Sequence, residues 1–217
     1  MIKGWLPKSI WKDEPCYIIG GGSSLEDFPW DSLRGQNVIG CNAAFYMGAD
    51  LVPIMIFGDG AFLKKHRTGL NQYAEAGGQV ITCSPAAVTK RFDPPEYLKQ
   101  IDKQEKGLAI DAVGWNRNTG SAAINLALLL GANPIYLLGY DMQLTKGKKN
   151  FHNAYNDTPN PKAYERFADG MILVARDLKL LFPNRCVINL EDGTSALNVF
   201  PKESLKNHLS NLKECVI

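Results

Sequence analysis

Short runs of apolar residues recur along the chain of 217 residues, and most of them are continuous rather than alternating. Continuous runs are typical of strands that are buried on both faces of a parallel sheet. They predict strands at 16–19, 37–41, 51–57, 80–83, 135–138 and 186–190. Between them, apolar positions at helical spacing predict helices at 61–75, 119–130, 161–181 and 203–212. This alternation predicts an α/β fold, a single Rossmann-like domain over residues 1–217 with a doubly wound, mostly parallel sheet.

Two long segments lack this regularity. Residues 84–115 are rich in Pro, Lys and Asp, and residues 143–160 are rich in Lys, Asn and Pro. Long irregular segments in a compact domain are usually functional loops or disordered. Because ligands of open parallel sheets bind outside the carboxyl ends of the strands, we predict that both segments are lid-like loops over that edge. The residues that directly follow the apolar runs are then the candidates for the site: 20–24, Asn42, Asp59, Ser84, Asp141 and 191–195.

Composition and charge argue against several classes of function. No apolar stretch approaches the roughly 18 residues that a membrane helix needs, and no apolar run follows the early lysines as in a secretory signal, so we expect no membrane span and a cytoplasmic location. A net charge of +2 argues against nucleic acid as a partner. The five cysteines form no CxxC pair, so neither a zinc site nor a redox pair is expected.

The stretch "CYIIGGGSSLEDF" places three glycines and two serines directly after the first predicted strand. Glycines let a ligand approach the main chain more closely than any Cβ would allow, and the N–H groups of such a loop suit an anion. A tight turn is the other explanation, although it needs fewer glycines. The candidate ligand-binding residues in this loop are Gly20, Gly21, Gly22 and Ser24.

A second stretch, "NRNTGSAAINLALLL", predicts a helix with a small-residue start. Thr119 is a suitable N-cap, Gly120 and Ser121 leave the first-turn N–H groups open to a phosphate, and Arg117 offers a bidentate guanidinium. A capped core helix explains the apolar part equally well. Together with the glycine loop, this helix start predicts a nucleotide site. The sequence of the glycine loop matches neither the Walker loop nor the GxGxxG fingerprint.

Single acidic and histidine side chains complete the candidate site. Asp59 and Asp141 each follow a strand, where a carboxylate holds ribose hydroxyls or Mg²⁺, or simply caps the next helix. We expect His66 and His208 to be solvated, because their helices are amphipathic and carry charged neighbours. His152 lies in the loop after Asp141, and a side chain that titrates near neutrality is a candidate general acid or base there.

The motifs "IIGGGSSLEDF", "VIGCN" and "RNTGSAAINLALLLGANPIYLLGYD", then a loop histidine and "CVINLEDGTSALNVF", follow one another along nearly the whole chain. This order resembles that of the small bacterial sialyltransferases that use CMP-sialic acid, with their GxGPSL loop, strand ending in CN, RxTSG helix start, GxxxIYLxGxD strand and catalytic histidine. The resemblance implies a glycosyltransferase that moves a sugar from a nucleotide donor, CMP-linked in that family, to the hydroxyl of a glycan or other acceptor, with no required cofactor.

Residue roles follow from the resemblance. It implies that Gly20, Gly21, Gly22 and Ser24 surround the nucleotide and that Asn42 contacts its ribose or phosphate. It implies that Arg117, Thr119, Gly120 and Ser121 hold the donor, and that His152 is the general base. The chain departs from the family pattern at Ser23, where the family has proline, and at Asp59, where it has asparagine. Where the family has loop tyrosines, this chain offers Gln143, Lys146, Lys148 and Lys149.

Two further readings stay open. The glycine loop and the helix–strand motif also resemble the 6-hydroxymethylpterin pyrophosphokinase-like proteins, which have bacterial and phage members. That resemblance implies a Mg²⁺-dependent pyrophosphoryl or nucleotidyl transferase in which Asp59 and Asp141 would hold the metal. The last reading is a catalytically idle nucleotide-binding or assembly module. A homo-oligomer is compatible with each of the three readings.

Overall fold

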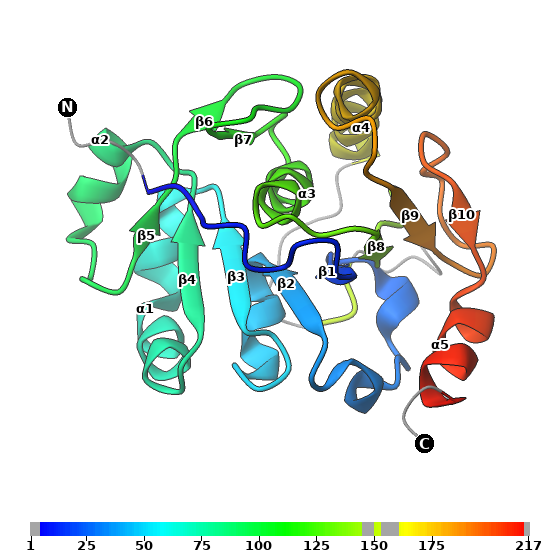
Figure 1. Ribbon diagram of the computed structural model, residues 1–217. Coiled ribbons are helices and arrows are strands. Elements are labelled where there is room, and N and C mark those ends of the chain that lie inside the picture. Colours follow the sequence, from blue (N-terminus) through cyan, green and yellow to red (C-terminus); the bar gives the residue numbers. More distant parts are fainter. Residues whose placement is uncertain (1–4, 145–149, 153–160, 215–217) are drawn as a thin grey trace.

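The protein is an α/β domain built on one parallel sheet, as seen in a computed structural model that describes residues 5–144, 150–152 and 161–214. In this part of the chain eight strands pair in the order β10-β9-β8-β1-β2-β3-β4-β5 (Figure 1). Every pairing is parallel. The strands are β1 (Cys16–Ile19), β2 (Asn37–Cys41), β3 (Ile54–Phe57), β4 (Gln79–Thr82), β5 (Lys99–Gln100), β8 (Ile135–Leu138), β9 (Val187–Leu190) and β10 (Lys202–Glu203).

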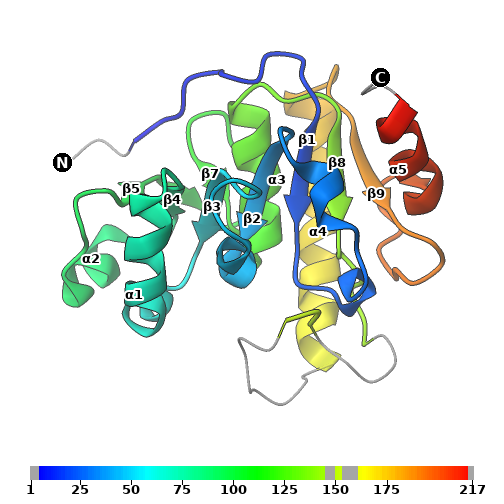
Figure 2. The same ribbon diagram turned by 90° about the horizontal axis from the view of Figure 1, so that it is seen from below.

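Helices cover both faces of this sheet, as the predicted doubly wound fold requires (Figures 1 and 2). Helices α3 and α4 lie on one face, and α1 and α5 lie on the other. Their bounds are α1 (Gly60–Glu75), α2 (Ala86–Thr89), α3 (Thr119–Leu129), α4 (Pro161–Leu181) and α5 (Leu205–Glu214). Short 3₁₀ turns follow the first two strands: η1 (Ser23–Leu25), η2 (Trp30–Leu33) and η3 (Asn42–Met47).

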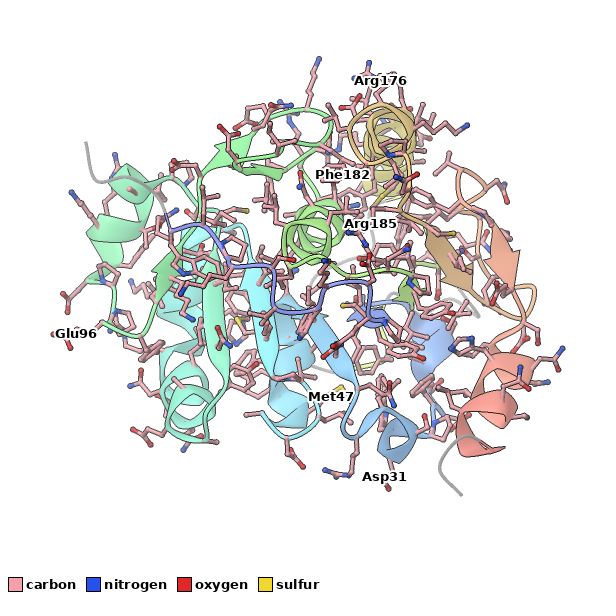
Figure 3. All side chains as sticks on the ribbon, viewed as in Figure 1. Asp31, Met47, Glu96, Arg176, Phe182 and Arg185 are labelled. Carbon is pink, nitrogen blue, oxygen red and sulfur yellow. The ribbon has the colours of Figure 1, made fainter. Side chains whose placement is uncertain are left out.

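Alternate residues of the central strand β1 pack into different halves of the core. Cys16 and Ile18 pack in the cluster that contains α3, whereas Tyr17 and Ile19 pack in a cluster on the opposite face. All four are essentially inaccessible to solvent, which explains the continuous apolar run in the sequence. Side chains fill the space between the sheet and its helices (Figure 3). Among the described residues, no helix is long and apolar enough to cross a membrane.

Residues 84–115 are not one continuous irregular loop, although most of them lie outside helices and strands. This segment contains α2, a 3₁₀ turn η4 (Lys90–Phe92), the edge strand β5 and a second small sheet of β6 (Lys103–Gln104) and β7 (Val113–Gly114). The small sheet is fastened to α3 by Asn125, whose Oδ1 accepts the N–H groups of Ala109 (2.8 Å) and Gly114 (2.9 Å). These long-range bonds satisfy the polar backbone that made the segment resemble a loop.

The order in which successive strands join the sheet reverses between β1 and β8. From β1 the sheet is built outward through β2, β3, β4 and β5, and from β8 it is built in the other direction through β9 and β10. In such sheets the connections that leave neighbouring strands in opposite directions open a crevice at their carboxyl ends. The topology therefore places the expected ligand crevice beyond Ile19 and Leu138.

Candidate functional site

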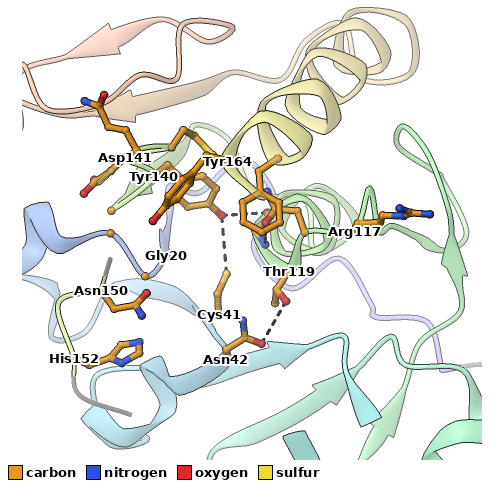
Figure 4. Close-up of a pocket in the computed structure, with 18 of the residues that line it drawn as sticks. Gly20, Cys41, Asn42, Arg117, Thr119, Tyr140, Asp141, Asn150, His152 and Tyr164 are labelled. Carbon is orange, nitrogen blue, oxygen red and sulfur yellow. Dashed lines mark hydrogen bonds between the residues drawn. The ribbon is translucent and has the colours of Figure 1, made fainter. Parts of the chain in front are cut away.

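A cavity of about 320 Å³ lies at this crevice, against the carboxyl ends of β1, β2 and β8 and the first turns of α3 and α4 (Figure 4). Nine of the twelve residues predicted from the sequence for the site line this cavity, although they come from five separate parts of the chain. They are Gly20, Gly21, Gly22, Asn42, Arg117, Thr119, Gly120, Asp141 and His152. Ser24, Asp59 and Ser121 do not line it, and neither do the other residues that follow predicted strands, Ser84 and 191–195.

Two of the three glycines are required by the close packing of β1 against β8. The N–H of Gly20 donates to the Leu138 carbonyl and the N–H of Gly22 to the Gly139 carbonyl, both at 2.8 Å. A Cβ on either residue would lie 2.7 or 2.5 Å from the Gly139 oxygen, closer than real contacts allow. The expectation that these two N–H groups face an anion is therefore wrong, because they extend the pairing of the two strands.

Gly21 differs from its neighbours. It is half-buried in the cavity wall, and a Cβ there would meet only the Asn150 side chain, at 3.0 Å from Oδ1. No backbone atom of the described residues lies within 4 Å of that Cβ position. Of the three glycines, Gly21 is thus the one whose missing side chain leaves room in the cavity rather than between strands.

Asp141 anchors the glycine loop. Its carboxylate is 3% exposed and accepts two hydrogen bonds from Ser24, one from the backbone N–H at 3.0 Å and one from the hydroxyl at 2.5 Å. A buried carboxylate requires such donors, because desolvation without them is costly. The pair holds the loop after β1 against the end of β8, which gives Ser24 a structural role at the edge of the site.

The first turn of α3 is capped by Asn118 and not, as predicted, by Thr119. Asn118 has extended backbone angles, and its Oδ1 accepts the N–H of Gly120 at 2.8 Å. The Thr119 hydroxyl instead donates to Asn42 Oδ1 at 3.3 Å (Figure 4). Ser121 points into the core and donates to the Gly114 carbonyl. The amide nitrogen Nδ2 of Asn118 is buried and has no hydrogen-bond partner among the described residues.

Residues with left-handed backbone angles gather around the cavity. Six non-glycine residues of the described chain have positive φ, and three of them line the cavity: Asn42 (52°), Arg117 (55°) and Met142 (53°). Each such conformation costs roughly 1–3 kcal/mol, and such residues cluster at functional sites. The Arg117 side chain is exposed and extends away from Asn42 and Thr119 (Figure 4), so its contact with a phosphate stays a prediction.

Two tyrosines that the sequence reasoning missed form part of the wall. Tyr140 is buried, its hydroxyl donates to the Gly120 carbonyl at 3.1 Å, and burial holds its pKa far above the ordinary value. The Tyr164 hydroxyl, in the first turn of α4, is buried without a hydrogen-bond partner in the described part of the chain. Burial and then the nearby Asp141 charge raise the pKa of Tyr164, so the phenol remains a proton donor.

A signal for Tyr164 was available in the sequence. A helix that directly follows a loop over the site has its first turn at the site as well, and Tyr164 is the fourth residue of α4. Most of the loop itself falls outside the described residues, including Lys146, Lys148 and Lys149. Of its described residues, Gln143, Asn150 and His152 line the cavity.

His152 is half-buried and faces the cavity from the side opposite Thr119 (Figure 4). Burial, the largest effect, lowers the pKa of His152 below its ordinary value of 6.5. The imidazole is therefore mostly neutral near pH 7, which is the form that accepts a proton. The neighbouring thiol of Cys41 is not a nucleophile, because burial raises its pKa to about 12.

The other two histidines are not solvated, contrary to the prediction. His66 is 5% exposed, with Nδ1 2.9 Å from the Tyr46 hydroxyl. His208 joins α5 to the sheet, because its Nε2 lies 3.0 Å from the hydroxyl of the buried Tyr17. Neither lines the cavity. Both hydroxyl partners lie far away in sequence, so helical periodicity alone did not reveal the burial.

Asp59 caps α1, which was the alternative to a ligand role. Its carboxylate is exposed and accepts the N–H of Ala61 at 2.9 Å, and it does not line the cavity. Strand β3, which precedes Asp59, is three strands away from β8, which precedes Asp141, so about 14 Å separates the two strand ends. One Mg²⁺, with ligands at about 2.1 Å, cannot bind both carboxylates. Within the described ranges, no group of three or more His, Cys, Asp or Glu residues is placed to hold a metal.

Comparison with solved structures finds the sialyltransferase CstII from Campylobacter jejuni. Its complex with the substrate analogue CMP-3FNeuAc is 15% identical, with 88% of this chain and 87% of that chain covered and a TM-score of 0.52. Its complex with cytidine-5'-monophosphate is 12% identical, with 88% and 85% covered and a TM-score of 0.54. Monomeric CstII is 14% identical, with 87% and 85% covered and a TM-score of 0.50.

These similarities concern the fold, which confirms the predicted Rossmann-like architecture and its likeness to a sialyltransferase. Neither protein-family models nor curated protein sequences match the chain. The comparisons give no support to the resemblance to pyrophosphokinase-like proteins.

Proposed function

We propose that this protein is a glycosyltransferase that moves a sugar from a cytidine-nucleotide donor to the hydroxyl of an acceptor. The observation that carries the proposal is the cavity at the β1–β8 crevice, in a fold similar to that of a sialyltransferase solved with CMP ligands. Its walls hold two buried polar atoms, Asn118 Nδ2 and the Tyr164 hydroxyl, for which the described residues offer no hydrogen-bond partner. Buried polar atoms are rarely left unpaired, so a ligand that supplies acceptor atoms fits this site.

In the proposed complex the phosphate of the donor lies near the first turn of α3. The amino end of a helix favours an anion, and Asn118 adds an amide donor there while its Oδ1 keeps the cap. The phenol of Tyr164 donates to the same phosphate, on which charge develops as the nucleotide leaves. Gly21 allows the nucleotide to approach the backbone after β1.

In the proposed reaction the acceptor oxygen forms a bond to the anomeric carbon while the bond from that carbon to the phosphate oxygen breaks. CMP leaves with the electron pair of the broken bond. The acceptor hydroxyl passes its proton to the neutral imidazole of His152, whose lowered pKa suits this role at neutral pH. The scheme uses no cofactor.

Nucleotide binding tests the first half of the proposal. We expect CMP, among CMP, CDP, UDP, GDP, ADP and ATP, to raise the melting temperature without Mg²⁺. At 100 times Kd the stabilisation is about 2.7 kcal/mol, or roughly 5–10 °C for a chain of this size. Stabilisation by ATP with Mg²⁺ alone would favour the pyrophosphokinase reading, and no stabilisation by any nucleotide would favour a module without this activity.

Asn118 offers a matched pair of variants. Asn118→Ser and Asn118→Asp both keep a good N-cap, so the fold should be retained. Both lose the amide donor, and the aspartate also adds a negative charge beside the phosphate. We expect CMP affinity to fall in the order parent, Asn118→Ser, Asn118→Asp. Equal affinity in all three would contradict the placement of the phosphate at α3. Release of CMP from CMP-sialic acid then tests the transfer itself.

A further inference from the structure

A second hollow lies beside the donor cavity and shares part of its wall. This acceptor groove, as we name it, has a volume of about 430 Å³ and is open to solvent. Met142, Gln143 and Tyr164 line both hollows. Leu144, Glu165 and Ala168 complete the groove, with Tyr164 and Ala168 one helical turn apart on α4.

Most of the groove wall is apolar, whereas the donor cavity combines apolar and aromatic side chains with amides, hydroxyls, a carboxylate and an imidazole. A sugar with several hydroxyl groups would leave many of them unpaired against Met142, Leu144 and Ala168, which is costly. A neutral apolar group gains from the same burial. The Glu165 carboxylate at the rim disfavours an anionic occupant.

The position of the groove relates its occupant to the reaction. In the proposed function, on which this inference rests, the acceptor hydroxyl enters the donor cavity to reach the anomeric carbon. The rest of the acceptor must then lie in a space that adjoins the cavity, and the groove adjoins it across the Tyr164 wall. We infer that the acceptor groove binds an apolar group carried by the acceptor, so that the preferred acceptor is a neutral glycoside with an aryl or alkyl aglycone.

The experiment uses the full-length protein saturated with CMP and a panel of simple sugars, each as the methyl and the phenyl glycoside. Calorimetric titration gives the Kd of each. We expect at least one phenyl glycoside to bind about 10- to 100-fold more tightly than its methyl partner, because its ring is buried in the groove. Phenyl glycosides that bind no more tightly than their methyl partners, or do not bind, would overturn the inference. Failure of CMP itself to bind would instead overturn the proposed function.

Ala168→Glu places a charge in the acceptor groove without touching the donor cavity, which Ala168 does not line. Glutamate is a good helix former, so α4 should persist. We expect this variant to lose about 10-fold in affinity for the phenyl glycoside, with unchanged affinity for the methyl glycoside and for CMP. The matched control is Ile172→Glu, at an exposed position one turn further along α4 and outside both hollows. An equal loss in both variants would overturn the inference, because the effect would then come from charge alone.

Discussion

The glycine loop allows a sharp test, because its three glycines have different neighbours. Gly22 has φ −59° and ψ 140°, which alanine adopts readily, so only the added methyl group matters. That methyl would lie 2.5 Å from both the Gly139 carbonyl oxygen and the Asp141 carboxyl group. Neither can rotate away, because one is backbone and the other is held by Ser24. Gly22→Ala must therefore push β1 and β8 apart at their ends.

Overpacking of this kind costs about 1–3 kcal/mol. Replacing glycine by alanine also restricts the unfolded chain, which raises the free energy of unfolding by about 0.4–1 kcal/mol. With the middle of each range, the net loss for Gly22→Ala is about 1.3 kcal/mol, and at roughly 2–4 °C per kcal/mol the melting temperature should fall by about 3–5 °C. For Gly21→Ala the new methyl group meets, among the described residues, only the end of the Asn150 side chain, so we expect no loss of stability.

Thermal unfolding of the parent and both variants, followed by CMP titration, separates fold from ligand. Gly21→Ala should melt like the parent but bind CMP about 10-fold more weakly, because its methyl group enters the donor cavity. A Gly22→Ala variant that melts like the parent would refute the assignment of this glycine to strand packing. A Gly21→Ala variant with unchanged CMP affinity would show that Gly21 does not approach the nucleotide.

Three further predictions concern other side chains. His152→Ala should leave CMP affinity nearly unchanged while transfer, or slow hydrolysis of a CMP-linked donor, falls by about 10²–10⁴-fold; a fall in affinity instead would place His152 in donor binding. Asn125→Ala, which strips partners from the buried N–H groups of Ala109 and Gly114, should cost about 3–5 kcal/mol in chemical denaturation, whereas Ala at the exposed Asn198 should cost almost nothing. Burial lowers the folded-state pKa of His208 below 6.5, so the stability that neutral His208 contributes is full above about pH 6.5 and is lost as the pH falls toward the folded-state pKa. Between pH 7 and 5, His208→Gln should therefore lose less stability than the parent. Equal losses in the two proteins would contradict this.

Much of the fold could be read from the sequence, because the signals are local. Six continuous apolar runs predicted the six longer strands. Because each of these strands is covered on both faces, its own residues are apolar throughout, and the strand is visible in the sequence without knowledge of its neighbours. The rule that ligands bind beyond the carboxyl ends of parallel strands correctly brought Gly20, Gly21, Gly22, Asn42 and Asp141 to one cavity, although other residues that it named, such as Asp59 and Ser84, do not line it. The rule places residues that are distant in sequence at the same edge of the sheet, and it does so without any knowledge of strand order.

What the tertiary structure alone decided depends on contacts between distant residues. The apolar pattern could not show that 84–115 folds into strands, because its polar backbone is satisfied from α3 and from Asp177, which accepts the N–H of Leu108 across 69 positions of sequence. Nor could it show that Gly20 and Gly22 pack against the end of β8 while Gly21 faces the cavity, because three identical residues have no local difference in sequence. Apolar periodicity reports burial along one element, whereas the partner of each polar group is set by how the elements meet.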